Sequence, residues 1–225
     1  MIRFGFVIAS VAFAVNALPA EPVKLSLKSG KVELPEALAE ALKPEFATDA
    51  FTIQDGETNA MTLWFRKEIP VKASAEQIKN GLTFREIPEG TLVGMVKFEK
   101  AFVDYRKQEL PSGTYTLRMA VQPDTGDHKD TAPHADFVLL SPIADDKSLE
   151  VVELKDLVRR SLKVTGSDHP AVMLLFPHFG KETDAKLVPK ENGVQCLQWK
   201  RPVKSDAGDS MLGFGLVVAG FSKTR

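Results

Sequence analysis

The chain has 225 residues, with 29 Lys and Arg residues against 30 Asp and Glu residues and a formal net charge of −1. This balance argues against nucleic-acid binding, because a protein that neutralises phosphates shows an excess or a stripe of basic residues. Hydrophobic residues make up 44% and charged residues 26% of the chain, which is the mix of a folded globular protein. The single cysteine, Cys196, excludes an intrachain disulfide and any metal site built from several cysteines.

The first twenty residues have the three-part organisation of a secretory signal peptide. Arg3 gives a short basic start, an uncharged apolar run follows from Phe4 to Val15, and small residues precede the acidic Glu21. We predict a signal peptide over residues 1–20, cleaved after Ala20 or at an earlier site after Ala17. An uncleaved N-terminal anchor is the alternative, although the run is shorter than the roughly 20 residues that a bilayer-spanning helix needs.

Cleavage after Ala20 removes one arginine and no acidic residue, so the mature chain has a net charge of −2. We expect residues 21–225 to form a single exported domain without a transmembrane span, in a periplasm or outside the cell. Such a chain is long enough to be stabilised by its hydrophobic core alone, without disulfides. A separate subdomain beginning after about residue 148 is the alternative organisation.

Apolar and polar residues alternate through most of the N-terminal half, a pattern typical of half-buried strands. A turn is expected at Ser29-Gly30. Two short helices are also expected, one over 35–42 with Pro35 near its start and one over 73–80 capped by Ser74 and ended by Gly81. The predicted strands cover residues 23–28, 31–34, 50–53, 61–65, 82–87 and 92–98.

The C-terminal half continues the strand pattern around one amphipathic helix, predicted over 153–163 and stopped by Gly166. A continuous apolar run between Pro170 and Pro177 is typical of a strand buried on both faces. Trp64 and Trp199 are interpreted as core residues. Further strands are predicted within 110–121, 135–140, 194–199 and 211–221, with a polar loop over 204–209. The fold class predicted is mainly β, an antiparallel β-sandwich of immunoglobulin-like type with one or two inserted helices.

The segment Leu110-Pro-Ser-Gly-Thr-Tyr115-Thr-Leu-Arg118 resembles the tyrosine corner of immunoglobulin-like and fibronectin-like sandwiches. In that motif a tyrosine near the start of a strand turns its hydroxyl back onto the upstream backbone. The longer pattern, from this segment through Gln122-Pro-Asp-Thr-Gly-Asp-His128 to Phe137-Val-Leu-Leu-Ser-Pro142, resembles a group of uncharacterised exported bacterial proteins over residues 80–178. That resemblance implies export and a sandwich-like fold, and no activity.

A short segment between two of these strands gathers four aspartates and two histidines within Asp124–Asp136. Carboxylate and imidazole groups together hold divalent cations, imidazole favouring zinc, copper or nickel and carboxylates alone favouring calcium. The candidate metal ligands are Asp124, Asp127, His128, Asp130 and His134. The spacing matches no standard metal motif, and Asp, Gly, Thr and Pro are also the residues that hairpin loops use to turn. A metal site and a simple turn therefore both stay open.

The remaining sequence signals favour structure over catalysis. His169 and His178 flank the buried strand and are expected at its opposite ends, so at most one of them joins the Asp124–Asp136 segment. There is no nucleophile elbow, P-loop or haem motif, and Gly213, Gly215 and Gly220 are interpreted as sites where another chain segment packs closely. The sequence predicts an exported, non-enzymatic module that binds an unidentified protein or small ligand. The alternatives are a divalent-metal-binding protein and, third, a hydrolase with a dispersed acid pair.

Overall fold

The structure is a computed structural model that describes residues 24–123 and 132–221, so the predicted signal peptide lies outside it. Two α-helices, α1 (Ala75–Asn80) and α2 (Leu154–Thr165), occur in this part of the chain, and neither is long and apolar enough to cross a membrane. Its strands are β1 (Leu25–Lys31), β2 (Phe46–Asp55), β3 (Thr58–Arg66), β4 (Ile69–Pro70), β5 (Leu92–Phe98), β6 (Phe102–Val103), β7 (Glu109–Leu110), β8 (Gly113–Val121), β9 (Asp136–Pro142), β10 (Val172–Pro177), β11 (Lys186–Pro189), β12 (Gln195–Ser205) and β13 (Gly208–Ala219).

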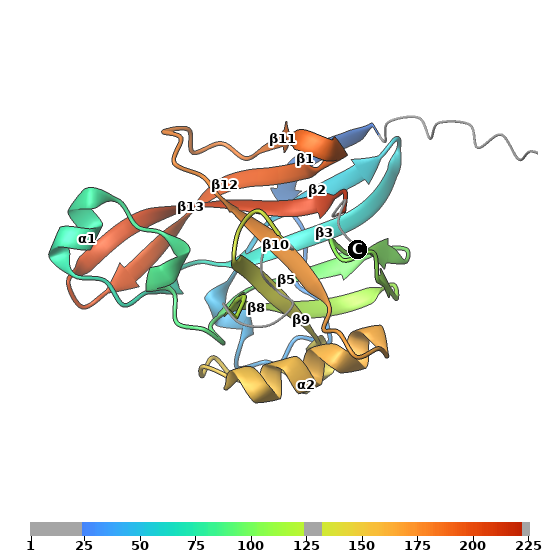
Figure 1. Ribbon diagram of the computed structural model, residues 1–225, viewed down its shortest axis with the longest axis horizontal. Helices are drawn as coiled ribbons and strands as arrows, with labels where there is room; N and C mark the ends of the chain where they lie inside the picture. The colour runs from blue at the N-terminus through green and yellow to red at the C-terminus, as the bar shows by residue number, and fades with distance from the viewer. Residues whose placement is uncertain (1–23, 124–131, 222–225) are drawn as a thin grey trace, which may run out of the picture.

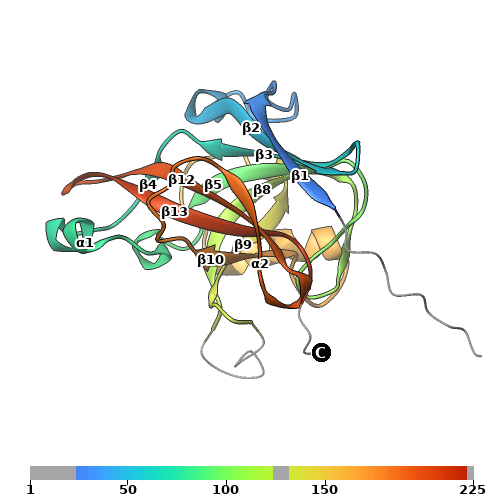
Figure 2. The same cartoon turned by 90° about the horizontal axis from the view of Figure 1, so that it is seen from above.

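Most of these strands form one large sheet in the order β1-β2-β3-β5-β8-β9-β10-β13-β12-β11. Neighbours along this path are antiparallel, β4 adds to β12 as a parallel strand, and β6 and β7 form a separate hairpin. The sheet curls so far that its first and last strands, β1 and β11, approach each other (Figures 1 and 2). The prediction of a mainly β, antiparallel fold with inserted helices is therefore confirmed.

The two halves of the sheet are joined by β10. Its first residues, from Val172, pair with β9, and its last residues, through Pro177, pair with β13. Gly213 and Gly215 on β13 allow this change of partner. A Cβ at Gly213 would overlap the carbonyl oxygen of His178, and one at Gly215 would lie 2.7 Å from the carbonyl oxygen of Phe176. The interpretation of these glycines as sites of close packing is confirmed.

The main core lies inside the curl and takes residues from both halves of the sheet. Trp199 is nearly fully buried there, with its ring centroid 4.2 Å from that of Phe65 and 5.1 Å from that of Phe214. Trp64, next to Phe65 in β3, points to the outer face and is buried in a second cluster with Leu38, Leu42 and Phe46. The prediction that both tryptophans are core residues is confirmed.

Both helices begin and end where the sequence signals place them. Ser74 caps α1 in a capping box with Gln77, and Gly81 follows the helix with a φ of 97°. The helix expected over 153–163 is α2, which ends at Gly166 in the left-handed conformation. Figure 1 shows α2 lying below the sheet. The buried Leu157 packs it against Ala120 of β8 and Leu139 of β9.

The helix predicted over 35–42 is wrong. The segment forms successive turns in which Leu38 N–H donates to the Pro35 carbonyl and Leu42 N–H to the Ala39 carbonyl, and a 3-10 helix follows at Lys43–Glu45. Leu38 and Leu42 are both buried against Trp64, so packing on the sheet determines this backbone in place of helix propensity.

Three other local predictions differ from the structure. The strand expected over 82–87 is a 3-10 helix at Phe84–Glu86, because Glu86 accepts from the Thr83 backbone while the Thr83 hydroxyl caps the turn. The turn expected at Ser29-Gly30 is absent, since β1 runs straight through it paired with β2. The loop expected over 204–209 is a tight hairpin between β12 and β13.

The tyrosine-corner geometry is present at the start of β8. The Tyr115 hydroxyl donates to the Pro111 carbonyl oxygen over 2.9 Å, and its ring lies 5.7 Å from that of Phe98. Gly113, between Pro111 and Tyr115 in the chain, has a φ of 153°, and a Cβ there would approach the Tyr115 hydroxyl. The segment is therefore closed by one side-chain bond to the upstream backbone.

We expect Tyr115→Phe to lower the free energy of unfolding by about 1 kcal/mol, the usual net value of one hydrogen bond, because the ring is kept and only the bond to Pro111 is lost. Chemical denaturation of both proteins measures the difference. An unchanged unfolding midpoint would contradict the role given to the hydroxyl.

We expect Gly213→Ala to destabilise the fold by about 1–3 kcal/mol, because the added methyl group meets the backbone of His178. Gly30→Ala is the matched control: its Cβ has open space within β1, so it should be neutral or slightly stabilising. Thermal unfolding of the two variants compares them, and equal melting temperatures would contradict the close approach of β10 and β13.

Candidate functional site

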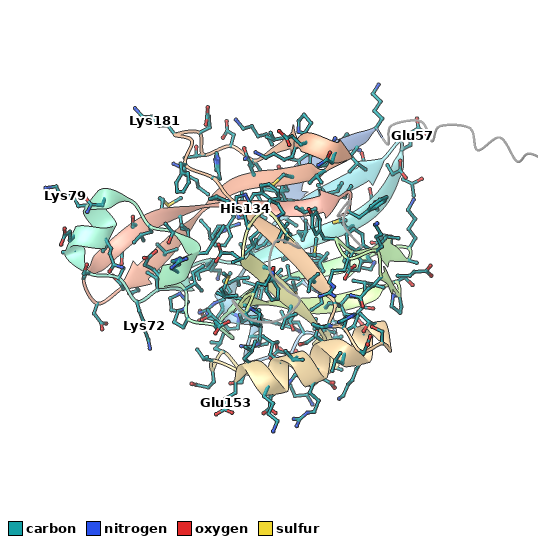
Figure 3. The ribbon with its side chains drawn as sticks, viewed as in Figure 1. Glu57, Lys72, Lys79, His134, Glu153 and Lys181 are labelled. Carbon is teal, nitrogen blue, oxygen red and sulfur yellow. The ribbon has the colours of Figure 1, made fainter. Side chains whose placement is uncertain are left out.

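The predicted metal-binding segment is only partly described by the structure. Asp124, Asp127, His128 and Asp130 lie outside the described residues. His134, labelled in Figure 3, is described. Its ring makes a T-shaped contact with that of Phe176, with centroids 4.5 Å apart. His134 therefore packs against β10, the strand that carries Phe176.

The surroundings of His134 favour a neutral imidazole. Burial lowers the pKa of His134, against the opposing influence of Asp136 and with a further lowering by Lys190. Burial also raises the pKa of Asp136. Among the described residues, no three His, Cys, Asp or Glu side chains are grouped so that they could hold a metal ion. The divalent-metal site stays a prediction.

The two other histidines near β10 are separated by the strand. His169, before it, is half exposed and lies 3.8 Å from the Asp168 carboxylate. His178, after it, is buried, and its ring adjoins Gly180. Because His134 packs on Phe176, it shares the His178 end of the strand.

A buried ion pair joins β8 to the segment before α2. Arg118 on β8 is fully buried and bonds both oxygens of Asp146, at 2.7 Å from Nε and 2.6 Å from Nη2. Its remaining donors bond the carbonyl oxygens of Gly90, Ser148 and Glu150. The guanidinium group is fully occupied in joining the sheet to the segment before α2, so it offers nothing to a ligand.

An apolar cleft opens at the end of the curled sheet where β13 ends near the start of β1. Its volume is about 220 Å³. Apolar side chains form most of its surface, and Asp55 and Lys100 are its charged residues. The lining residues are Leu25, Ile53, Asp55, Ala60, Met61, Lys100, Ala101, Phe102, Val103, Val218, Ala219, Gly220 and Phe221.

The cleft has a fixed floor and an exposed apolar rim. Phe102 stacks on the buried Phe98 with ring centroids 4.5 Å apart and planes 8° from parallel. Val103 and Phe221 are 45% and 51% exposed, so the rim presents two apolar side chains to solvent. Lys100 lies 3.1 Å from the Asp55 carboxylate. Concave apolar surface beside a few polar groups is the usual form of a small-molecule site.

A larger cleft of about 650 Å³ lies at the other end, between the segment after β3 and the β12–β13 hairpin. Its charged residues largely offset each other: Lys204 lies 3.7 Å from Glu68, and Arg66 lies 3.3 Å from Glu45 outside the cleft. The Lys204–Glu68 pair is exposed and of the kind that contributes little, whereas Arg66 is buried. The apolar cleft is therefore the better candidate site.

Sequence patterns gave no sign of the apolar cleft. Its residues come from β1, β2, β3, β6 and β13, and within each strand they show the ordinary alternation of a core face. The nearest signal is the pair Phe102-Val103, two apolar residues that follow soon after the strand ending at Phe98. Comparison with known protein families, curated proteins and solved structures found no match.

The lone cysteine is not a reactive thiol. Cys196 is fully buried on β12, and burial raises its pKa to about 12. The thiolate is the nucleophilic form, so a thiol that stays protonated at neutral pH is inert.

We expect Cys196 in the native protein to resist a disulfide reagent such as 5,5′-dithiobis(2-nitrobenzoate), even at mildly alkaline pH. The denatured protein should release one equivalent of thionitrobenzoate per chain, since it has one cysteine. Absorbance with and without guanidinium chloride measures both. Equal rates in the two conditions would contradict the burial of this thiol.

Proposed function

We propose that this protein is an exported, non-enzymatic binding module that takes a short alkyl or aryl group into the apolar cleft. The observation that carries the proposal is the cleft of about 220 Å³ whose rim exposes Val103 and Phe221 to solvent. Export is supported by the signal-peptide pattern of residues 1–20. The immunoglobulin-like form of the sandwich stays a prediction beside it.

The size of the cleft limits what it can hold. An apolar cavity of about 150 Å³ accommodates a benzene molecule, and drug-sized ligands occupy sites of about 300–1,000 Å³. A cleft of about 220 Å³ fits one ring or a short alkyl chain, with the rest of the ligand outside.

The chemistry of the lining favours binding over turnover. Asp55 and Lys100 lie at hydrogen-bond distance from each other, and the other described residues that line the cleft have no nucleophilic or acid–base side chain. Transfer of apolar surface out of water is then the main source of affinity. The hydrolase alternative and the metal-binding alternative remain predictions with no described site.

Hexan-1-ol is a suitable probe, because it supplies an alkyl chain of the right size and no charge. We expect it to shift the methyl NMR signals of Leu25, Ile53, Met61 and Val218, with saturation at millimolar concentration. Val103→Asp should weaken binding about fivefold, since it replaces about 1 kcal/mol of apolar contact by a solvated charge.

Val32→Asp is the matched control, because Val32 is also a partly exposed valine (37%) but does not line the cleft. It should leave the affinity for hexan-1-ol unchanged. If hexan-1-ol does not shift the methyl signals of the cleft residues, the proposed function is wrong. It is also wrong if both variants bind hexan-1-ol with the affinity of the parent protein.

A further inference from the structure

We propose that the natural ligand is an anionic amphiphile, an alkyl carboxylate whose chain fills the apolar cleft and whose head group binds Lys107. This inference rests on the proposed function and adds the charge of the ligand to it. Three observations support it: the position of Lys107, the contacts of its ammonium group and the charges of the neighbouring residues.

Lys107 does not line the cleft itself, but it places a cation next to a residue that does. Its Nζ lies 5.5 Å from the ring centroid of Phe221, one of the exposed residues that line the cleft. Within residues 24–123 and 132–221, no carboxylate lies within 4.0 Å of this ammonium group, in contrast to Lys100 with Asp55. The exposed ring is therefore the described partner of Lys107, and the ammonium group keeps its donors for a ligand.

The backbone of Lys107 is unusual for a lysine. Its φ is 67°, and Asn192 is the other non-glycine residue with positive φ in the described chain. This left-handed conformation favours glycine and is unfavourable for a residue with a Cβ. Glycine would adopt this backbone without that cost, so lysine is an uncommon residue for the position.

A buried carboxylate holds the turn in place. Asp104 is fully buried, and its carboxylate accepts from the backbone N–H groups of Arg106 and Gln108, each at 2.9 Å. It also accepts from Val172 N–H at 3.3 Å, which ties the β6–β7 hairpin to the start of β10. The Gln108 amide adds a bond to the Pro170 carbonyl. Lys107 therefore projects from a rigid support, which reduces the entropy cost of binding.

Arg106, next to Lys107 in the same turn, is also an exposed cation without a described carboxylate partner, and Lys107 is the one of the two with a described contact to a cleft-lining residue, Phe221. Lys100 and Asp55 neutralise each other at 3.1 Å. Glu109 is opposite Val103 in the β6–β7 pair, so it adds a negative charge to the same hairpin without reaching Lys107. A carboxylate head group can accept a charge-assisted hydrogen bond from Lys107 while the ammonium group keeps its contact with the Phe221 ring.

The test compares hexanoate with hexan-1-ol, which have the same chain length and differ in charge at neutral pH. We expect the parent protein to bind hexanoate about three- to fivefold more tightly at low ionic strength, the size of one exposed charge interaction. High salt should remove the difference, because exposed charges are screened. Titrations followed through the cleft methyl signals give both dissociation constants.

Lys107→Gly is the decisive variant, because glycine suits the left-handed backbone and the fold should be at least as stable. It should bind hexanoate no better than hexan-1-ol while its affinity for hexan-1-ol stays unchanged. Lys79→Ala is the matched control, since it removes one exposed charge on α1, at the opposite end of the molecule from Glu57 and the β2–β3 turn (Figure 3).

The outcomes separate the two proposals. Hexan-1-ol that binds in the cleft without any preference for hexanoate, or a Lys107→Gly variant that keeps the preference, would overturn the anionic head group alone. Failure of hexan-1-ol to bind would overturn the proposed function itself, and the head-group inference with it. A preference that is lost equally in Lys79→Ala would also overturn the inference, because net charge would explain it.

Discussion

The fold depends on β10 sharing its hydrogen bonds between two halves of the sheet. Its first half completes the β9 side and its second half starts the β13 side. Without this strand the path of hydrogen-bonded strands would be interrupted between β9 and β13. The core contact between Phe65 on β3 and Trp199 on β12 joins the two halves that β10 connects. The change of partner along β10 requires Gly213 and Gly215 on β13. A side chain at either position would meet the backbone of His178 or Phe176.

The cleft is a consequence of this curl. A sheet that bends until β1 approaches β11 encloses an apolar interior, and the interior meets solvent wherever no element covers its end. At the end near β13 the covering element is the β6–β7 hairpin, which places Phe102 against the core and leaves Val103 exposed. The buried Asp104 accepts from Val172 N–H at the start of β10, so the same strand that joins the sheet also supports the rim.

Local signals were reliable where the interaction is short in sequence. The capping box at Ser74 and Gln77, the Gly166 end of α2 and the Tyr115 bond to Pro111 each join residues at most four positions apart. The strand expected over 82–87 failed although its Thr83–Glu86 capping box is equally local, and the helix expected over 35–42 failed because distant residues determine the backbone. The 35–42 segment has helix-forming residues, yet burial of Leu38 and Leu42 on the outer face of the sheet holds it in turns. The cleft is the extreme case, since each contributing strand looks like ordinary core.

The sequence by itself determined the strand-rich class, most strand positions, the α2 helix, the tyrosine corner and the close packing at Gly213 and Gly215. These follow from periodicity and backbone freedom, which are properties of a few neighbouring residues. Tertiary structure alone decided that Ile53, Met61 and Val218 share one cleft and that Lys107 stands over Phe221 at its edge. The physical reason is the curl: it brings together strands far apart in the chain, and no local pattern encodes which of their core positions end beside solvent.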